Sequence, residues 1–376
     1  QLGPFRSEFY LTPFPNNFDQ GTIPWSDQLS LHEYRHVQQY NNFNNGLSRL
    51  MKTLFGQDGY DLAVNAAIPD WFYEGEAVHS ETVLTGQGRG RLPQFLNAYP
   101  ALWQARKKYS WMKMRNGSFK DYVPTHYHLG YLLVNHGYEK YGADFWKKVT
   151  ADASAYKSLF YPFQAAVRKH SGVTYKTFRE EALSAWREKP GRATRAGEEF
   201  LQPVNRRYVS SYYFPYRLAP DSLLYLKATY RHRPAFYIRD PTGEKRLRIR
   251  DISIDEQYSY RNGRIVYAAY ETDPRWSWRN YSVIRILDTR TGKPKKLTRR
   301  SRYFTPDISA DGSRVVAVEF AEEGRSELHV LDAATGAVLE RVGSPDVHLF
   351  TDPKFLDENR IVTAVRLRTG EMSLAL

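Results

Sequence analysis

Apolar and polar positions follow different patterns in the two halves of this chain. From residue 1 to about 190, apolar residues mostly recur at the spacing of helices. After about residue 205, short apolar runs alternate with turn-forming residues at regular intervals, which is typical of β-sheet. The polar stretch between these halves, residues 191–205, is expected to be a linker. We therefore expect a mostly helical domain over residues 1–190 and an all-β domain over residues 206–376.

Several segments of the first half carry signals for individual elements. The SEFYLT stretch, Ser7–Thr12, is expected to form a strand that ends at Pro13. A helix is expected to begin around Pro24 to Asp27, with Ser26 as its cap, and to run to the Asn-rich stretch that follows residue 40. Further helices are expected from near Pro69 onward and over three later segments, Tyr127–Tyr141, Phe145–Thr150 and Tyr175–Trp186.

Two turn signatures repeat in phase through the second half. One precedes an apolar strand four times: Asp221-Ser222 before LLYLKA, Asn262-Gly263 before RIVYAAY, Asp311-Gly312 before RVVAVEF, and Glu358-Asn359 before RIVTAVR. The other recurs between these copies as DPTG, DTRTG and DAATG. The period of about 42–49 residues is the length of one four-stranded propeller blade. A β-sandwich also has regularly spaced strands, but two signatures in phase favour the propeller.

The segment YFTPDISADGSRVVAVEF resembles the strand-turn-strand unit of TolB-like propellers. At this period, residues 206–376 hold about three and a half blades, whereas a propeller needs at least about four blades to close into a ring. We therefore expect a partial propeller that continues beyond Leu376 in the natural molecule.

The composition excludes several classes of site. The 376 residues include no cysteine, so disulfides, thiolate metal sites and cysteine nucleophiles are excluded, and any metal must be held by His, Asp or Glu. The net charge of +13 is spread over both halves and accompanies no nucleic-acid-binding motif, so we expect no nucleic-acid partner. No apolar run approaches the roughly 18–20 residues of a membrane span, so we expect no transmembrane segment in this chain.

The segment HEYRH, His32–His36, carries the clearest chemistry. Two histidines four residues apart on a helix point to the same side, so both imidazoles can reach one ion, and Glu33 then lies beside that ion. A carboxylate from a second helix would complete a three-ligand site with one open position, which is the layout of a catalytic zinc. The alternative is a solvated helix face. Burial is favoured, however, because the helix also carries the apolar residues Leu29, Leu31, Tyr34 and Val37.

The segment PDWFYEGEAVHSE, Pro69–Glu81, resembles the signature of the glutamate-zincin (gluzincin) metallopeptidases. In that family a glutamate on the helix after HExxH is the third zinc ligand, and the residue-by-residue match places it at Glu74, 38 residues after His36. Glu76 is the nearest competitor, but it should point away if Glu74 points in. Gly75 would keep the helix surface open near the metal. Glu81 matches an acidic position of the same pattern and could orient a ligand histidine, or it could be an ordinary surface carboxylate.

A third segment, Tyr127-His128-Leu129-Gly130, resembles the Tyr-x-x-Gly unit of aminopeptidase-N-like members, whose tyrosine stabilises the oxyanion. The alternative is an aromatic residue of a core helix, and His126 and His128 are rivals for the oxyanion role. The Gly-x-Met-Glu-Asn-type segment with which the aminopeptidases recognise a free amino terminus is missing. Endopeptidase and exopeptidase action therefore both stay open, and the closer likeness is to bacterial peptidase-MA-like proteins.

These features predict a multidomain protein with a mostly α (α+β) zincin-like domain followed by an incomplete propeller-type domain. The resemblance implies one Zn²⁺ per chain held by His32, His36 and Glu74, with Glu33 as general base and Tyr127 as oxyanion donor, acting on a peptide or protein substrate. The main alternative is a non-catalytic binding or scaffold protein whose propeller binds a protein partner, and a hydrolase of a non-peptide bond is another. Because bacterial proteins of this architecture are usually extracytoplasmic, we expect a periplasmic, secreted or cell-surface location.

Overall fold

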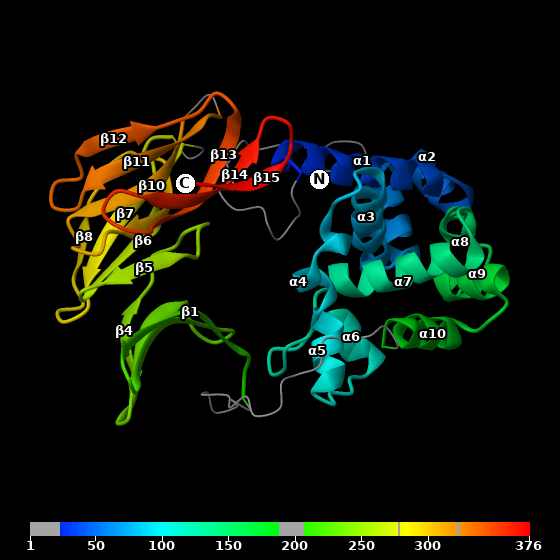
Figure 1. Ribbon diagram of the computed structural model, residues 1–376. Helices are drawn as coiled ribbons and strands as arrows, with labels where there is room; N and C mark the ends of the chain where they lie inside the picture. Colours follow the sequence, from blue (N-terminus) through cyan, green and yellow to red (C-terminus); the bar gives the residue numbers. More distant parts are fainter. Residues whose placement is uncertain (1–22, 188–206, 277–278, 322–323) are drawn as a thin grey trace. The chain divides into compact units, whose positions relative to one another are not determined.

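The computed structural model describes residues 23–187, 207–276, 279–321 and 324–376. These residues belong to two compact units, a helical unit and a β-sheet unit (Figure 1). The strand expected at Ser7–Thr12 and the linker expected at 191–205 lie outside the described residues.

Helices make up the regular structure described in the first unit. Their bounds are α1 (Trp25–Phe43), α2 (Gly46–Ala67), α3 (Asp70–Leu84), the 3-10 helix η2 (Arg89–Arg91), α4 (Pro93–Leu96), α5 (Ala98–Gln104), α6 (Trp111–Asn116), α7 (His126–Tyr141), α8 (Phe145–Ser154), α9 (Pro162–Ser171) and α10 (Tyr175–Arg187). The helices expected to begin near residues 24 and 69, and the three expected over later segments, correspond to α1, α3, α7, α8 and α10. The other helices, α2, α4, α5, α6, α9 and the 3-10 helix η2, were not predicted.

The helix starts differ from expectation in one detail, and α2 has an interruption. The N-cap position of α1 is Pro24, so the expected Ser26 cap is wrong: Ser26 lies inside the first turn, and its hydroxyl donates to Asp27 Oδ1 at 3.2 Å. In α2, Gly56 has a positive φ of 66° and joins two helical stretches across a kink. Such a conformation suits glycine, and it breaks the regular apolar spacing from which a helix is recognised in a sequence.

Helices α3 and α7 pack at very close range in the centre of the helical unit. Gly75 of α3 lies against Gly130 of α7, and a methyl group added to Gly130 would overlap the carbonyl oxygen of Trp71. The role expected for Gly75, to keep the helix surface open near the metal, is therefore wrong: its missing side chain lets α7 approach. Around this contact the core is aromatic, with the ring of Trp71 edge-on to those of Trp146 (6.0 Å between centroids) and Phe163 (5.6 Å).

The second unit is built from four separate antiparallel sheets in chain order. Three have four strands and the last has three. The strands are β1 (Ser210–Ala219), β2 (Ser222–Thr229), β3 (Ala235–Asp240), β4 (Gly243–Ile249), β5 (Tyr258–Arg261), β6 (Arg264–Thr272), β7 (Asn280–Asp288), β8 (Pro294–Lys296), β9 (Tyr303–Ile308), β10 (Arg314–Phe320), β11 (Ser326–Asp332), β12 (Val338–Val342), β13 (Val347–Phe355), β14 (Ile361–Leu367) and β15 (Met372–Ala375).

Both repeated turn signatures fall at equivalent places in these sheets. The first joins the first and second strands of every sheet, and the second joins the third and fourth strands of the three complete sheets. Between β5 and β6, for example, Asn262 and Gly263 both have positive φ (46° and 79°), as a two-residue hairpin turn requires. Four small sheets in succession follow the pattern of propeller blades and not the two sheets of a sandwich.

Successive sheets share apolar cores. Leu226 and Phe236 of the first sheet pack with Tyr267 of the second. Val266 and Ile286 of the second sheet share a cluster with Val315 and Leu331 of the third, and the third sheet packs on the fourth in the same way.

In the described part of the chain, no helix is both long and apolar enough to cross a membrane.

Candidate metal centre

Helix α1 buries a polar face. Its buried residues are Gln28, His32, His36, Gln39 and Phe43, which recur every three or four positions and so form one stripe along the helix. Burial of α1 was expected from its apolar residues, but Tyr34 is 61% exposed, and Leu29, Leu31 and Val37 are only partly buried. Since buried polar groups must be hydrogen-bonded or hold an ion, this stripe marks α1 as the place to look for chemistry.

The stripe brings two imidazoles to the carboxylate of α3 that the sequence singled out. Glu74 Oε2 lies 3.0 Å from His32 Nε2 and 3.7 Å from His36 Nε2. One ligand atom from each of the three residues falls within 4.8 Å of the others. Ligand atoms around a tetrahedral zinc with bonds of about 2.0–2.1 Å lie about 3.3 Å apart, so the spacing of this donor set fits such an ion.

The electrostatics of Glu74 also suit a ligand. Burial alone would raise the pKa of this carboxyl, but its interactions with the imidazoles of His32 and His36 outweigh burial and hold the pKa well below its usual range. Burial likewise disfavours the charged form of His32, but hydrogen bonds to Glu74 and Glu81 raise the pKa of this histidine overall. Glu74 is therefore a carboxylate at neutral pH, as a metal ligand must be.

The proton on His36 is placed by Gln39, which no sequence signal singled out. The side-chain NH₂ of Gln39 donates to the carbonyl oxygen of Tyr73 (3.0 Å) and to Glu76 Oε2 (2.8 Å). Its Oε1 atom, 2.8 Å from His36 Nδ1, must then act as acceptor. The proton of neutral His36 consequently sits on Nδ1, and the lone pair of Nε2 faces Glu74 and the ligand cluster.

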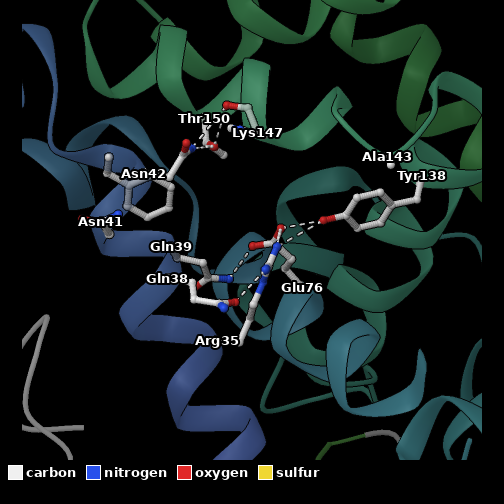
Figure 2. A pocket seen from close by; sticks show the side chains of 11 residues that line it. Arg35, Gln38, Gln39, Asn41, Asn42, Glu76, Tyr138, Ala143, Lys147 and Thr150 are labelled. Carbon is white, nitrogen blue, oxygen red and sulfur yellow. Dashed lines mark hydrogen bonds and ion pairs between the residues drawn. The ribbon is translucent and has the colours of Figure 1, made fainter. Parts of the chain in front are cut away.

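Glu76 holds Gln39 in place by accepting its side-chain hydrogen bond. Figure 2 shows Arg35, Gln39 and Tyr138 converging on its carboxylate, with Arg35 Nη2 at 2.5 Å and the Tyr138 hydroxyl at 2.7 Å from Oε1. Glu76 thus points away from the ligand cluster, as expected for the rival of Glu74. These groups line a polar pocket of about 390 Å³, whose lining includes none of His32, His36 and Glu74.

A second buried carboxylate lies beside His32. The side chain of Glu81 is fully buried, so it is not a surface group; its Oε2 atom lies 3.5 Å from His32 Nδ1. Arg89 of η2 pairs with Glu81 (Nε to Oε1, 2.6 Å) and brings its Nη2 within 3.0 Å of the same His32 nitrogen, while Gln28 donates to Glu81 at 3.0 Å. Both histidines of the candidate site are therefore held by a carboxylate-centred network.

An open cleft of about 450 Å³ gives access to the ligand cluster. Besides His32, His36 and Glu74, its lining includes Glu33, His126 and Tyr127. The third candidate for the oxyanion role, His128, stacks on Phe95 instead (4.3 Å between ring centroids), and its Nδ1 lies 2.9 Å from Thr125 Oγ1. The candidates from α1, α3 and the start of α7 thus meet in one cleft, without His128.

Tyr127 is placed and protonated as a donor should be. Its ring lies 6.3 Å from that of His32, and the guanidinium of Arg89 lies over it at 5.2 Å. Burial, reinforced by the negative charge of Glu74, raises the pKa of Tyr127 above its usual value. The phenol therefore keeps its proton at neutral pH and can donate a hydrogen bond into the cleft.

Comparison with known proteins assigns this chain to no family. No protein-family model and no curated protein matches. Among solved structures, TolB from Acinetobacter baumannii is 13% identical, with 41% of this chain and 40% of that chain covered and a TM-score of 0.29. The β-propeller domain of the Trilobed protease from Pyrococcus furiosus is 11% identical (44% and 57% covered, TM-score 0.28), and an acylaminoacyl peptidase of Pyrococcus horikoshii is 16% identical (42% and 28% covered, TM-score 0.29). The chain covers less than two thirds of each, and similarities of this size say nothing about its activity.

Proposed function

We propose that this protein is a zinc-dependent peptidase whose metal is held by His32, His36 and Glu74. The observation that carries the proposal is the convergence of the two Nε2 atoms and a Glu74 oxygen at the spacing of zinc ligands, in an open cleft that Glu33 also lines. Bound there, zinc would act as a Lewis acid and bring the pKa of a water molecule close to neutrality.

The chain's own residues divide the remaining work. The carboxylate of Glu33 takes the proton of the attacking water and later delivers it to the leaving amine of the peptide. The hydroxyl of Tyr127 donates to the oxyanion that forms on the peptide carbonyl, a contribution of about 2.7–4 kcal/mol for a well-placed donor. His126, which lines the same cleft, is the remaining candidate for that role or for a substrate contact.

A peptide or protein is the proposed substrate, and both endopeptidase and exopeptidase action fit an open cleft. The β-sheet unit would bind a protein partner or select substrates. A periplasmic, secreted or cell-surface location stays a prediction. The rival function, a scaffold that works only through its β-sheet unit, predicts a chain that neither needs zinc nor cleaves peptides.

Elemental analysis of the purified chain tests the metal site first. Wild type should hold close to one zinc per chain, and Glu74→Ala should lose it. Asp70→Asn is the matched control, because Asp70 lines the same cleft but is not in the ligand cluster, and it should keep the zinc.

Digestion of a peptide library then tests the reaction. Cleavage by the zinc-loaded wild type, abolished by a chelator and restored by zinc, supports a peptidase. Zinc binding without cleavage would favour a hydrolase of another bond, and a chain without zinc after reconstitution would favour the scaffold.

A further inference from the structure

A second pocket of the helical unit is basic and aromatic. It has a volume of about 350 Å³ and is lined by residues of α5, α6, α10 and the segment between α5 and α6. In Figure 1 these three helices lie on the other side of α7 from α1. The pocket shares no residue with the metal cleft. Five cationic side chains line it against one carboxylate, that of Glu180; the cations are Lys107, Lys108, Lys176, Arg179 and Arg187.

This charge is locally concentrated. Residues 101–120 include six Lys or Arg and no Asp or Glu. The side chain of Glu180 is 66% exposed, and its ion pair with Lys176 is long, at 3.9 Å, so Glu180 does little to neutralise the pocket. A concave surface lined by one sign of charge concentrates ligands of the opposite sign.

The two arginines are held in place by aromatic rings and not by carboxylates. The guanidinium of Arg179 lies 4.1 Å from the ring centroid of Trp111 and 4.8 Å from that of Tyr175, and Arg187 lies 5.2 Å from that of Trp103. Among the described residues neither arginine forms an ion pair with an acidic side chain. The Nε–H of Arg179 also donates to the carbonyl oxygen of Tyr175 at 3.3 Å. Both guanidinium groups are therefore pre-oriented, and their terminal N–H groups remain available for a carboxylate, which can accept two parallel hydrogen bonds.

We propose that this pocket binds an acidic segment of a polypeptide, with Asp or Glu carboxylates on Arg179 and Arg187 and further acidic residues near Lys107 and Lys108. The spread of cations from α5 through α10 suits several carboxylates along an extended chain. A single-stranded nucleic acid is a poorer match. Its bases need open aromatic faces to stack on, and here guanidinium groups already lie over Trp103, Trp111 and Tyr175. The site is independent of the metal and of the proposed peptidase activity.

Fluorescence anisotropy with the full chain tests the proposal, using a short labelled peptide rich in Glu and Asp. Because charge-assisted hydrogen bonds are strong, Arg187→Gln should weaken binding about tenfold. The double variant Lys107→Gln/Lys108→Gln should weaken it about threefold, since these exposed lysines contribute through solvent-screened charge. It also guards against misfolding, because neither lysine packs in the core. Lys147→Gln/Lys148→Gln, which removes two exposed charges from α8, should bind like wild type.

Three results would overturn the proposal. One is equal weakening by the α8 control, which would mean that only net charge matters. Another is binding of the analogue with Gln and Asn in place of Glu and Asp. The third is that wild type binds a single-stranded oligonucleotide, or vesicles of anionic lipid, more tightly than the acidic peptide, and that the same pocket variants weaken this binding.

Discussion

Helix α1 and strand β10 each bury a set of side chains, but of opposite kinds. In α1, four of the five buried residues are polar, and only Phe43 is apolar. In β10, the buried residues are Val315, Val316, Ala317, Val318 and Phe320. The β10 pattern lowers the free energy of the fold through apolar burial. The α1 pattern costs desolvation that a network must offset, which makes sense only if the polar groups serve a site.

The largest expected effect comes from changing the one α1 carboxylate that faces the cleft. Glu33→Gln should lower peptide turnover by about 10²–10⁴-fold, the usual contribution of a general acid–base group, while zinc content stays near wild type. Initial rates on a cleaved peptide and elemental analysis together check this. Asp27→Asn, an exposed acid of the same helix, is the control. Normal turnover by Glu33→Gln would remove Glu33 from the mechanism.

The contact between α3 and α7 lies in the helical unit, but it should be as intolerant of substitution as the apolar core around β10. Gly130→Ala places a methyl group against the Trp71 carbonyl, so we expect a loss of about 2–3 kcal/mol in the free energy of unfolding. Without that overlap, alanine would stabilise the helix by up to about 1 kcal/mol, so the sign of the change is decisive. Chemical denaturation measures it, with the exposed Glu139→Ala of α7 as control. A stabilised Gly130→Ala protein would contradict the close packing.

Gln39 allows the effect of the polar stripe to be separated from that of the proposed metal ligands. Gln39→Ala removes the acceptor that holds the proton on His36 Nδ1, so we expect zinc affinity to fall about 10–100-fold, as is typical when a ligand's hydrogen-bond partner is lost. Competition with a fluorescent zinc chelator measures the affinity. Gln38→Ala, next to it but exposed, should leave the affinity unchanged. Equal zinc affinities for Gln39→Ala and Gln38→Ala would mean that Gln39 contributes to the stability of the fold and not to metal binding.

In β10, the corresponding test is to introduce a polar group into a strand that buries only apolar side chains. Val316→Thr puts a hydroxyl of nearly the same shape into a fully buried apolar site, and we expect a loss of about 2 kcal/mol in the free energy of unfolding of the β-sheet unit. Val338→Thr on β12 is the matched control, because Val338 is 39% exposed and should change stability by less than about 0.5 kcal/mol. A tolerated Val316→Thr would show that β10 accepts polar groups as α1 does.

This contrast also explains what could be predicted from the sequence. Strand β10 and its turn were predicted because an apolar run and the Asp311-Gly312 signal are local. The meeting of His32, His36 and Glu74 follows from helical spacing and a recognisable second segment. The rest depends on contacts between distant positions. Arg89 reaches His32 across 57 residues, and Gln39 acts through groups of α3, so neither has a local signal.

The smallest expected effect concerns His128, a histidine of α7 that does not line the cleft. Burial, together with the nearby positive charge of Arg89, lowers its pKa from the ordinary 6.5 to about 4. Between these values the unfolded chain binds a proton that the folded chain refuses, so this histidine makes stability fall as the pH drops from 6.5 towards 4. Denaturation midpoints at several pH values should therefore fall less steeply for His128→Gln than for wild type. Thr125→Ala, which removes the hydroxyl partner but keeps the imidazole, should lower stability at every pH without flattening the slope. If the slopes of wild type and His128→Gln coincide, the packing of His128 on Phe95 does not exclude the proton.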